Sequence, residues 1–285
     1  MMTTHARCLI LTIVSTTFLS TTTFAADPPT SDPRTPIATV FSKPIYADEL
    51  ESSPSAQLPA GLTDEQRSQW QASQRNERLS QMISTPLVAQ FCQTHACEPT
   101  DEEITAFNQS VGRSRQQRLQ EWKSQHASLT AELQAPNVSE ARRTEATKEL
   151  QQVDSLLATE EHMYDGMTPE QRAAVEASRP AREKEIAGVF IRAWKFNKAL
   201  YQQYGGRVIF QQAGMEPLDA YRAWLQEHER NGDFAINDPD MHQRFWSYFV
   251  SEGHNFVPIE SFRQESGMAD PWEKPWWLVE PKKTP

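Results

Sequence analysis

The stretch IATVFSKPIYADEL, residues 37–50, marks the point where structure is expected to begin in this chain. Apolar residues alternate briefly along it as far as Ile45, and it turns polar at Asp48, a pattern typical of a short strand, a turn and the start of a helix. The residues before it, 26–36, are mostly Pro, Thr, Ser and Asp, which is typical of a flexible leader. We therefore expect a short N-terminal strand or hairpin that leads into helices.

Helix signals dominate the chain after this opening. Thr63 with Gln66 and Thr100 with Glu103 have the spacing of a capping box, in which the two side chains satisfy free backbone amides at the start of a helix. Apolar residues recur at helical spacing between these two starts: Leu79, Met82, Ile83, Leu87, Phe91 and Cys92. The pattern predicts a helix, a loop and a second helix.

Residues 113–165 have the pattern of a long antiparallel helical hairpin. Pro136-Asn137 marks its turn, and Glu, Gln, Lys and Arg are dense on both sides of that turn. The apolar residues recur at helical spacing: Leu119, Trp122, Leu129, Leu133, Ala146, Leu150, Val153 and Leu157. The charged remainder is typical of a solvated helix face.

Residues 168–260 form an aromatic-rich helical segment, in which the most apolar helix covers residues 186–204. We expect Pro180 to break the preceding helix and Pro86 to kink the earlier one, because proline lacks the amide hydrogen that a helix interior needs. The tail, residues 261–285, is too rich in Pro for regular structure. The predicted fold class is mainly α.

The first 25 residues have the three parts of a cleavable secretory signal. Arg7 is the only formal charge in this stretch, an apolar run diluted by Thr and Ser follows it, and Thr23-Phe24-Ala25 supplies small residues at the −3 and −1 positions. The run is too short to span about 30 Å of hydrocarbon, so stable membrane insertion is not expected. We expect an exported protein with residues 26–285 as its mature chain.

The charge balance argues against nucleic acid as a partner. The chain has 38 acidic and 28 basic residues, a formal net charge of −10, and no long run of Lys or Arg. Such an acidic surface repels a polyanion and keeps a protein dispersed. Charge and composition leave the oligomeric state open.

Cysteine usage agrees with export. Cys8 is expected to be removed with the signal, so the mature chain keeps only Cys92 and Cys97. An oxidising compartment favours a disulfide between two such cysteines. On one unbroken helix their Cα atoms would lie roughly 8.6 Å apart, whereas a disulfide needs less than about 7 Å. We therefore predict a disulfide on the condition that the helix ends near His95.

Catalytic and metal-binding patterns are not found. The chain has no GxSxG, HExxH, P-loop or GxGxxG motif, and its mature histidines are scattered singly. We expect no catalytic residues, no metal site and no cofactor.

The aromatic residues are the one unusual feature of the composition, with eight Trp in the chain. If the helices at 186–204, 217–230 and 239–250 pack as a bundle, six aromatic side chains come within reach of one another: Phe190, Trp194, Tyr201, Trp224, Phe245 and Trp246. Their helical spacing favours core packing, and the alternative is an apolar groove for unfolded or extended polypeptide. Sequence alone does not separate the two roles.

The N-terminal block resembles a known family of chaperone domains. IATVFSKPIYADEL is similar to the "VATVNGKPI…xxEL" opening of the SurA-type N-terminal domain found in periplasmic foldases. RNERLSQMISTPLVAQFC followed by EPTDEEITAFNQSV resembles the helix, loop and helix that come next in that family. The resemblance covers residues 37–112, and Phe41-Ser42 stands where the family usually has Asn-Gly.

The resemblance implies a chaperone domain without an isomerase domain. Relatives carry a Gly-rich parvulin module of prolyl isomerase activity, whereas this chain has only ten Gly and a helical hairpin at that place. In the family, helices returning from the C-terminal end complete the N-terminal domain, and the helices after Ile186 are the ones that would do so here.

These observations predict an exported, periplasmic, chaperone-like holdase or assembly protein that binds unfolded or extended polypeptide without catalysis. One alternative is a dedicated scaffold protein that docks one partner through residues 113–163. A second alternative is a divergent peptidyl-prolyl isomerase.

Overall fold

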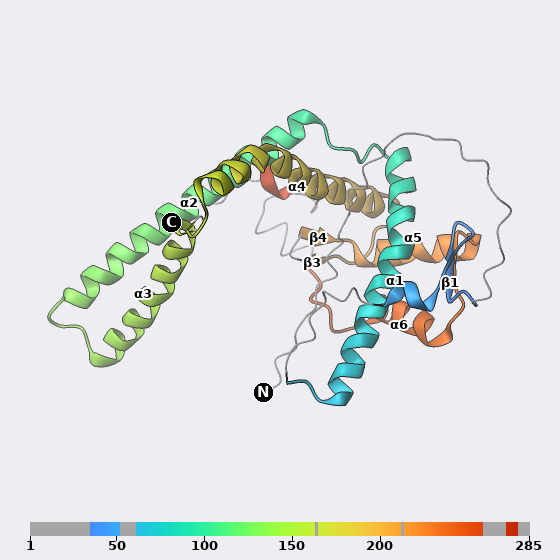
Figure 1. The fold of residues 1–285 in the computed structure, drawn as a ribbon, viewed down its shortest axis with the longest axis horizontal. Coiled ribbons are helices and arrows are strands. Elements are labelled where there is room, and N and C mark those ends of the chain that lie inside the picture. The colour runs from blue at the N-terminus through green and yellow to red at the C-terminus, as the bar shows by residue number, and fades with distance from the viewer. Residues whose placement is uncertain (1–34, 52–60, 163–164, 212–213, 259–271, 279–285) are drawn as a thin grey trace. The chain divides into compact units, whose positions relative to one another are not determined.

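The computed structural model describes five stretches of the chain: residues 35–51, 61–162, 165–211, 214–258 and 272–278. Within them the protein is mainly helical, with long helices and a few short strands (Figure 1), which confirms the predicted fold class. The predicted signal peptide, nearly all of the predicted leader and most of the predicted tail lie outside the described residues.

Six α-helices carry most of the described structure. They are α1 (Asp64–Thr94), α2 (Asp101–Gln134), α3 (Glu140–Glu161), α4 (Pro169–Tyr204), α5 (Leu218–Asn231) and α6 (Pro239–Val250). The strands are β1 (Ala38–Val40), β2 (Lys43–Ile45), β3 (Ile209–Gln211), β4 (Gly214–Glu216) and β5 (Phe234–Ile236). The described residues also include two 3-10 helices, η1 (Ala47–Leu50) and η2 (Trp276–Leu278).

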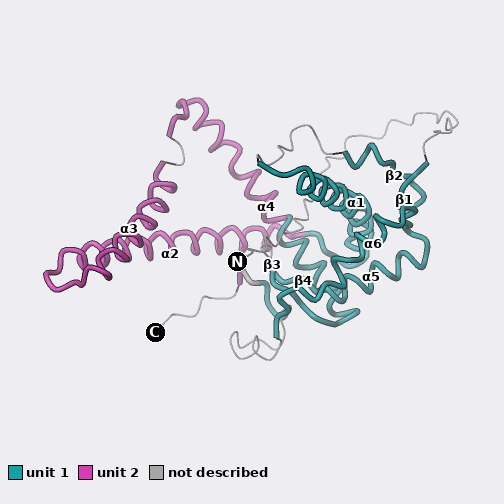
Figure 2. The backbone as a smooth tube through the Cα atoms, turned by 90° about the horizontal axis from the view of Figure 1, so that it is seen from below, with its two compact units in different colours: residues 1–98, 189–275 teal, residues 99–188, 276–285 magenta. Residues whose placement is uncertain are grey.

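The chain divides into two compact units, which Figure 2 shows in different colours. Unit 1 consists of residues 1–98 and 189–275, and unit 2 of residues 99–188 and 276–285. Unit 1 is therefore built from two separate parts of the sequence, and unit 2, apart from its last ten residues, is inserted between them.

The small sheet of unit 1 joins the two parts of the sequence that form this unit. β1 pairs with β2 in an antiparallel hairpin, as the sequence predicts, and pairs on its other edge with β5, giving the order β2-β1-β5. In the second pairing Ala38 lies opposite Ile236 and Val40 opposite Phe234. The segment after residue 186 thus completes the structure that the N-terminal segment begins.

The β1–β2 turn adopts a conformation that ordinary side chains disfavour. Phe41 and Ser42 have φ angles of 45° and 63°, both in the left-handed region. A two-residue hairpin turn with positive φ at both positions usually contains Asn-Gly, because these residues tolerate that region. The Asn-Gly pair of the SurA-type pattern suits this turn, and Phe41-Ser42 must adopt it at a cost.

Ser42→Gly should therefore raise the free energy of unfolding of the protein by about 1 kcal/mol, because glycine enters the left-handed region without steric penalty. Chemical denaturation of the variant and the parent measures the difference. Ser42→Val is the matched control and should be destabilising, since a β-branched residue fits this region worst. Equal stability of the two variants would contradict the strained turn.

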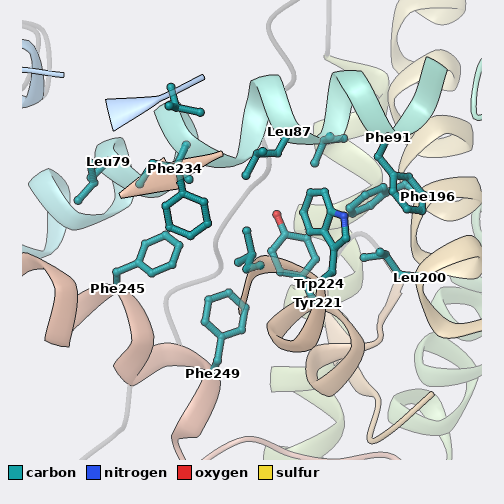
Figure 3. Close-up of a cluster of buried hydrophobic side chains, with 14 of the residues drawn as sticks. Leu79, Leu87, Phe91, Phe196, Leu200, Tyr221, Trp224, Phe234, Phe245 and Phe249 are labelled. Atoms are coloured by element: carbon teal, nitrogen blue, oxygen red, sulfur yellow. The ribbon is translucent and has the colours of Figure 1, made fainter. Parts of the chain in front are cut away.

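The core of unit 1 gathers side chains from both parts of the chain. α1 contributes a buried stripe at the spacing that the sequence predicts, and α5 and α6 pack on it through aromatic residues (Figure 3). The fully buried members with the largest side chains include Trp224, Phe196, Phe234, Leu79 and Leu87. This core is where the two ends of the sequence are held together, through apolar burial rather than through the short sheet alone.

Unit 2 contains the predicted helical hairpin, formed by α2 and α3. Its buried core is small and consists of Leu129, Ala146 and Val153, with Trp122, Leu133, Leu150 and Leu157 packed against it. Near the turn, Arg142 of α3 binds Glu132 of α2 through two hydrogen bonds of 2.7 and 2.9 Å. Arg115 of α2 also pairs with Glu160 of α3, so the hairpin is held by one narrow apolar seam and by ion pairs across its helices.

Two predicted boundaries differ from the structure. The predicted boundary between residues 37–112 and 113–165 falls inside α2, which runs unbroken from Asp101, so the first turns of α2 belong with the hairpin. The predicted break at Pro180 is wrong, because α4 continues through it. Pro180 lies in an exposed part of α4, where water can satisfy the carbonyl group that proline leaves without an amide donor.

Candidate functional site

The six aromatic residues singled out in the sequence do not form a single cluster. Trp224 and Phe245 are core residues, each with 2% of its surface exposed, and Trp246 is partly buried against the same core. The other three belong to α4 and lie outside this core cluster, partly exposed: Phe190, Trp194 and Tyr201. The core role that the sequence left open is therefore confirmed for Trp224 and Phe245, and the groove role stays a prediction.

The α4 residue that reaches the core aromatics is Phe196, which sequence reasoning did not select. Its ring lies 5.4 Å from Trp224 and 5.3 Å from Phe91, both in edge-to-face geometry (Figure 3). Such aromatic pairs add to the stability from apolar burial. The sequence does contain a pattern for this face, since Phe196 and Leu200 stand four residues apart. However, α4 is apolar around most of its circumference, so the pattern does not identify which side faces the core.

We call Phe190, Trp194 and Tyr201 the α4 stripe. Their spacings of four and seven residues place them within about 40° of one another around the helix, at 100° per residue. The core-facing side, which includes Phe196 and Leu200, lies roughly a third of a turn away. The stripe is thus an aromatic line on a different side of the helix from the core.

Two contacts give the α4 stripe its local character. The ammonium group of Lys198 lies 4.9 Å from the ring centre of Trp194, within the range of a cation–π interaction. The ring of Tyr201 lies 6.1 Å from that of Trp272, a residue with 2% of its surface exposed. The stripe therefore combines partly exposed aromatic surface with a positive charge at its edge.

The part of α4 that carries the stripe is tied to the end of the α1 segment. Arg192 binds the carboxylate of Glu98 with two hydrogen bonds, of 3.2 and 2.8 Å, and Lys195 donates to the backbone oxygen of Glu98 at 2.8 Å. A two-point guanidinium–carboxylate contact fixes orientation as well as distance. These contacts hold the turn of α4 that contains Trp194, which lies between the two cations in sequence.

The two mature cysteines lie together at the C-terminal end of α1. The helix ends at Thr94 with His95 as its cap, so the condition that the sequence set for their approach is met. Ala96 then adopts a φ of 51°, and the amide of Cys97 donates to the backbone oxygen of Cys92 at 3.3 Å. This is the pattern of a Schellman motif, which turns the chain back onto the last helical turn.

Both cysteines carry free thiols in the structure and are buried. The interaction between the side chains of Cys92 and Cys97 raises the pKa of Cys92 and lowers the pKa of Cys97, and the Cys97 thiol donates to the backbone oxygen of His95 at 4.0 Å. Lys195 and Arg192 lower the pKa of Cys97 further, while burial and Glu98 act in the opposite direction. The disulfide itself stays a prediction.

A second group of titratable residues surrounds Glu216, at the end of β4. Desolvation raises the pKa of Glu216 to about 7, and a hydrogen bond with Tyr248 of α6 acts in the opposite direction. Part of its surface remains open to solvent, yet protein atoms enclose it on most sides. Burial and the charge of Glu216 raise the pKa of the nearby Tyr221 of α5, and a hydrogen bond with Ser84 of α1 acts in the opposite direction. These groups link four elements of unit 1.

The described residues offer no group of three or more His, Cys, Asp and Glu side chains placed to hold a metal ion. Over the same part of the chain, every helix is too short or too polar to cross a membrane. Comparison with family models, curated proteins and solved structures found no match for this chain.

Proposed function

We propose that this protein is an exported, chaperone-like holdase of the periplasm that binds unfolded or extended polypeptide without catalysis. The observation that carries the proposal is the α4 stripe, a line of three aromatic residues kept out of the core cluster on a helix whose other side builds that core. Partly exposed aromatic side chains bind apolar segments of many sequences, because such contacts need no fixed partner geometry.

The arrangement of unit 1 supports the same proposal. Its N-terminal hairpin, β1–β2, is completed by β5, and α6 packs against α1, so the two ends of the chain form one unit. This discontinuous arrangement is what the resemblance to the SurA-type N-terminal domain implies. The secretory signal predicted for residues 1–25 supports the proposed location in the periplasm.

The proposed mechanism is passive. Apolar segments of an unfolded client bind along the α4 stripe and are thereby kept from associating with one another. The formal net charge of −10 keeps the complex dispersed. The cation at Lys198 favours segments that carry an acidic residue beside an aromatic or aliphatic one.

Trp194→Ala should weaken suppression of client aggregation about fivefold or more, as expected for loss of a central aromatic contact, with little change in thermal stability. The measurement is light scattering of a thermally unfolded, unrelated protein at increasing concentrations of the variant. The matched control is Phe196→Ala, two residues away on the same helix, which removes a core aromatic with 2% of its surface exposed.

The control should lower the melting temperature strongly and retain holdase activity at matched folded fraction. The proposal fails if Trp194→Ala suppresses aggregation as well as the parent protein does, or if both variants lose stability and activity in parallel.

A scaffold role is the second candidate, and one observation favours it. The core cluster between α2 and α3 is small, with Leu129, Ala146 and Val153 buried, and the hairpin exposes apolar side chains, among them Leu156 at 43% and Val111 at 40%. A scaffold would retain one stoichiometric partner in a pull-down, and Trp194→Ala would leave that partner bound. The third reading, a divergent prolyl isomerase, requires catalysed isomerisation that a point mutation abolishes.

A further inference from the structure

The end of α1 and the middle of α4 together build a paired-thiol site. The Schellman turn places Cys97 over Cys92, and both side chains belong to the buried core of unit 1. The residue after Cys97 is Glu98, which Arg192 and Lys195 of α4 hold through three hydrogen bonds. Two buried thiols brought together by a turn, whose next residue is held by two cations, form an arrangement suited to redox chemistry rather than to packing alone.

The two thiols are not equivalent. Cys92 lies within the last turn of α1, where the neighbouring Cys97 and burial raise its pKa. Cys97 lies in the turn, with the exposed residues Ala96 and Glu98 on either side of it. Local opening of that turn exposes Cys97 without unfolding α1, and local openings of this kind cost less than global unfolding.

We propose that Cys92 and Cys97 form a reversible dithiol–disulfide site that reacts with dialkyl disulfides, with Cys97 as the attacking nucleophile and Cys92 as the resolving thiol. This property is independent of polypeptide binding. It goes beyond a static structural bridge, because it assigns a reduced working state and a separate role to each sulfur.

The reaction consists of two exchanges. The Cys97 thiolate attacks one sulfur of the external disulfide, whose S–S bond breaks and releases one thiolate, leaving a mixed disulfide on Cys97. Cys92 then gives up its proton to the released thiolate and attacks the Cys97 sulfur, forming the Cys92–Cys97 bond and releasing the second thiolate. The second thiolate takes back from water the proton that Cys97 first lost, so the protein dithiol is oxidised by two electrons and the external disulfide is reduced to two thiol groups.

Matched single variants test the assignment, with oxidised glutathione as the probe on the folded, fully reduced mature protein. In Cys92→Ser the serine hydroxyl can still donate to Cys97, so we expect rapid formation of a stable mixed disulfide, seen by intact mass. In Cys97→Ser only Cys92 remains, and the mixed disulfide should form at least tenfold more slowly. The parent protein should form the intramolecular bond and retain no adduct.

Two results would overturn the proposal. The first is a reaction of Cys97→Ser as fast as that of Cys92→Ser, which would remove the assigned roles. The second is a rate for Cys92→Ser equal to the rate of global unfolding, measured separately by dilution into denaturant, which would make the pair a buried structural feature. Circular dichroism of both variants verifies that they are folded before the rates are compared.

The contribution of the cations has its own readout. In the Cys92→Ser background, Lys195→Gln should move the midpoint of the rate–pH profile to higher pH, because the charge that favours the Cys97 thiolate is lost. Loosening of the turn alone would instead raise the rate at every pH and leave the midpoint unchanged. An unchanged midpoint therefore overturns the role assigned to α4.

Discussion

Trp224→Ala should lower the free energy of unfolding by about 3–5 kcal/mol, the range for truncating a large buried aromatic residue. Trp224 has 2% of its surface exposed and makes edge-to-face contacts with three aromatic rings at 5.4 to 5.8 Å, those of Phe91, Phe196 and Tyr221. Its ring also lies 4.9 Å from that of His228. The residue therefore joins α1, α4 and α5, and its loss leaves a cavity that all three elements line.

The measurement is chemical denaturation followed by far-ultraviolet circular dichroism, which reports helix content rather than the tryptophan signal. Thermal unfolding is a second readout. The melting temperature should fall by roughly 10 °C, given about 2–4 °C per kcal/mol for a protein of this size. Trp224→Phe is the control and should recover most of the loss, because it restores much of the buried apolar volume. A loss below 1 kcal/mol would contradict the core role of Trp224.

Glu216→Gln should make the protein more stable at pH 8 and leave its stability at pH 5 nearly unchanged. The folded-state pKa of Glu216 is raised from 4.5 to about 7 by desolvation. Between these values the folded state binds more protons than the unfolded state, so stability is greatest at low pH and falls as the pH rises through this window. Above pH 7 the full cost of the buried carboxylate is present.

The expected gain at pH 8 is about 2–3 kcal/mol, which allows for the part of the Glu216 surface that is open to solvent. Unfolding free energies of the variant and the parent at pH 5 and pH 8 measure it. Tyr248→Phe is the informative second variant, because its hydroxyl group lowers the pKa of Glu216. Removing that hydroxyl should raise the pKa of Glu216 and so extend to higher pH the range over which stability falls. Equal pH dependence of the parent and Glu216→Gln would contradict the assignment.

Helix starts were predictable because the interactions that define them are local. The pairs Thr63 with Gln66 and Thr100 with Glu103 form both hydrogen bonds of the capping box, within three residues of sequence. The α2–α3 hairpin was predictable for a similar reason, since its apolar seam repeats at helical spacing on both sides of one Pro-containing turn. Local chemistry also set the condition for the cysteines, namely an end of α1 near His95.

The location of the candidate site was not predictable, because it depends on which side of α4 turns inward. Phe190, Trp194 and Phe196 are all large apolar residues of one helix, and sequence reasoning chose the first two as neighbours of Trp224. Phe196 is the one that makes this contact. A helix that is apolar on several sides has no hydrophobic periodicity strong enough to identify its inner face.

The sequence by itself therefore determined the mainly helical class, the hairpin and the starts of the helices, because these depend on side chains a few residues apart. Tertiary structure alone decided the pairing of β1 with β5, the division of the aromatics between the core and the α4 stripe, and the burial of Glu216. Each of these joins residues that are far apart in the chain. Their free energy comes from burying surfaces that no local pattern identifies as partners.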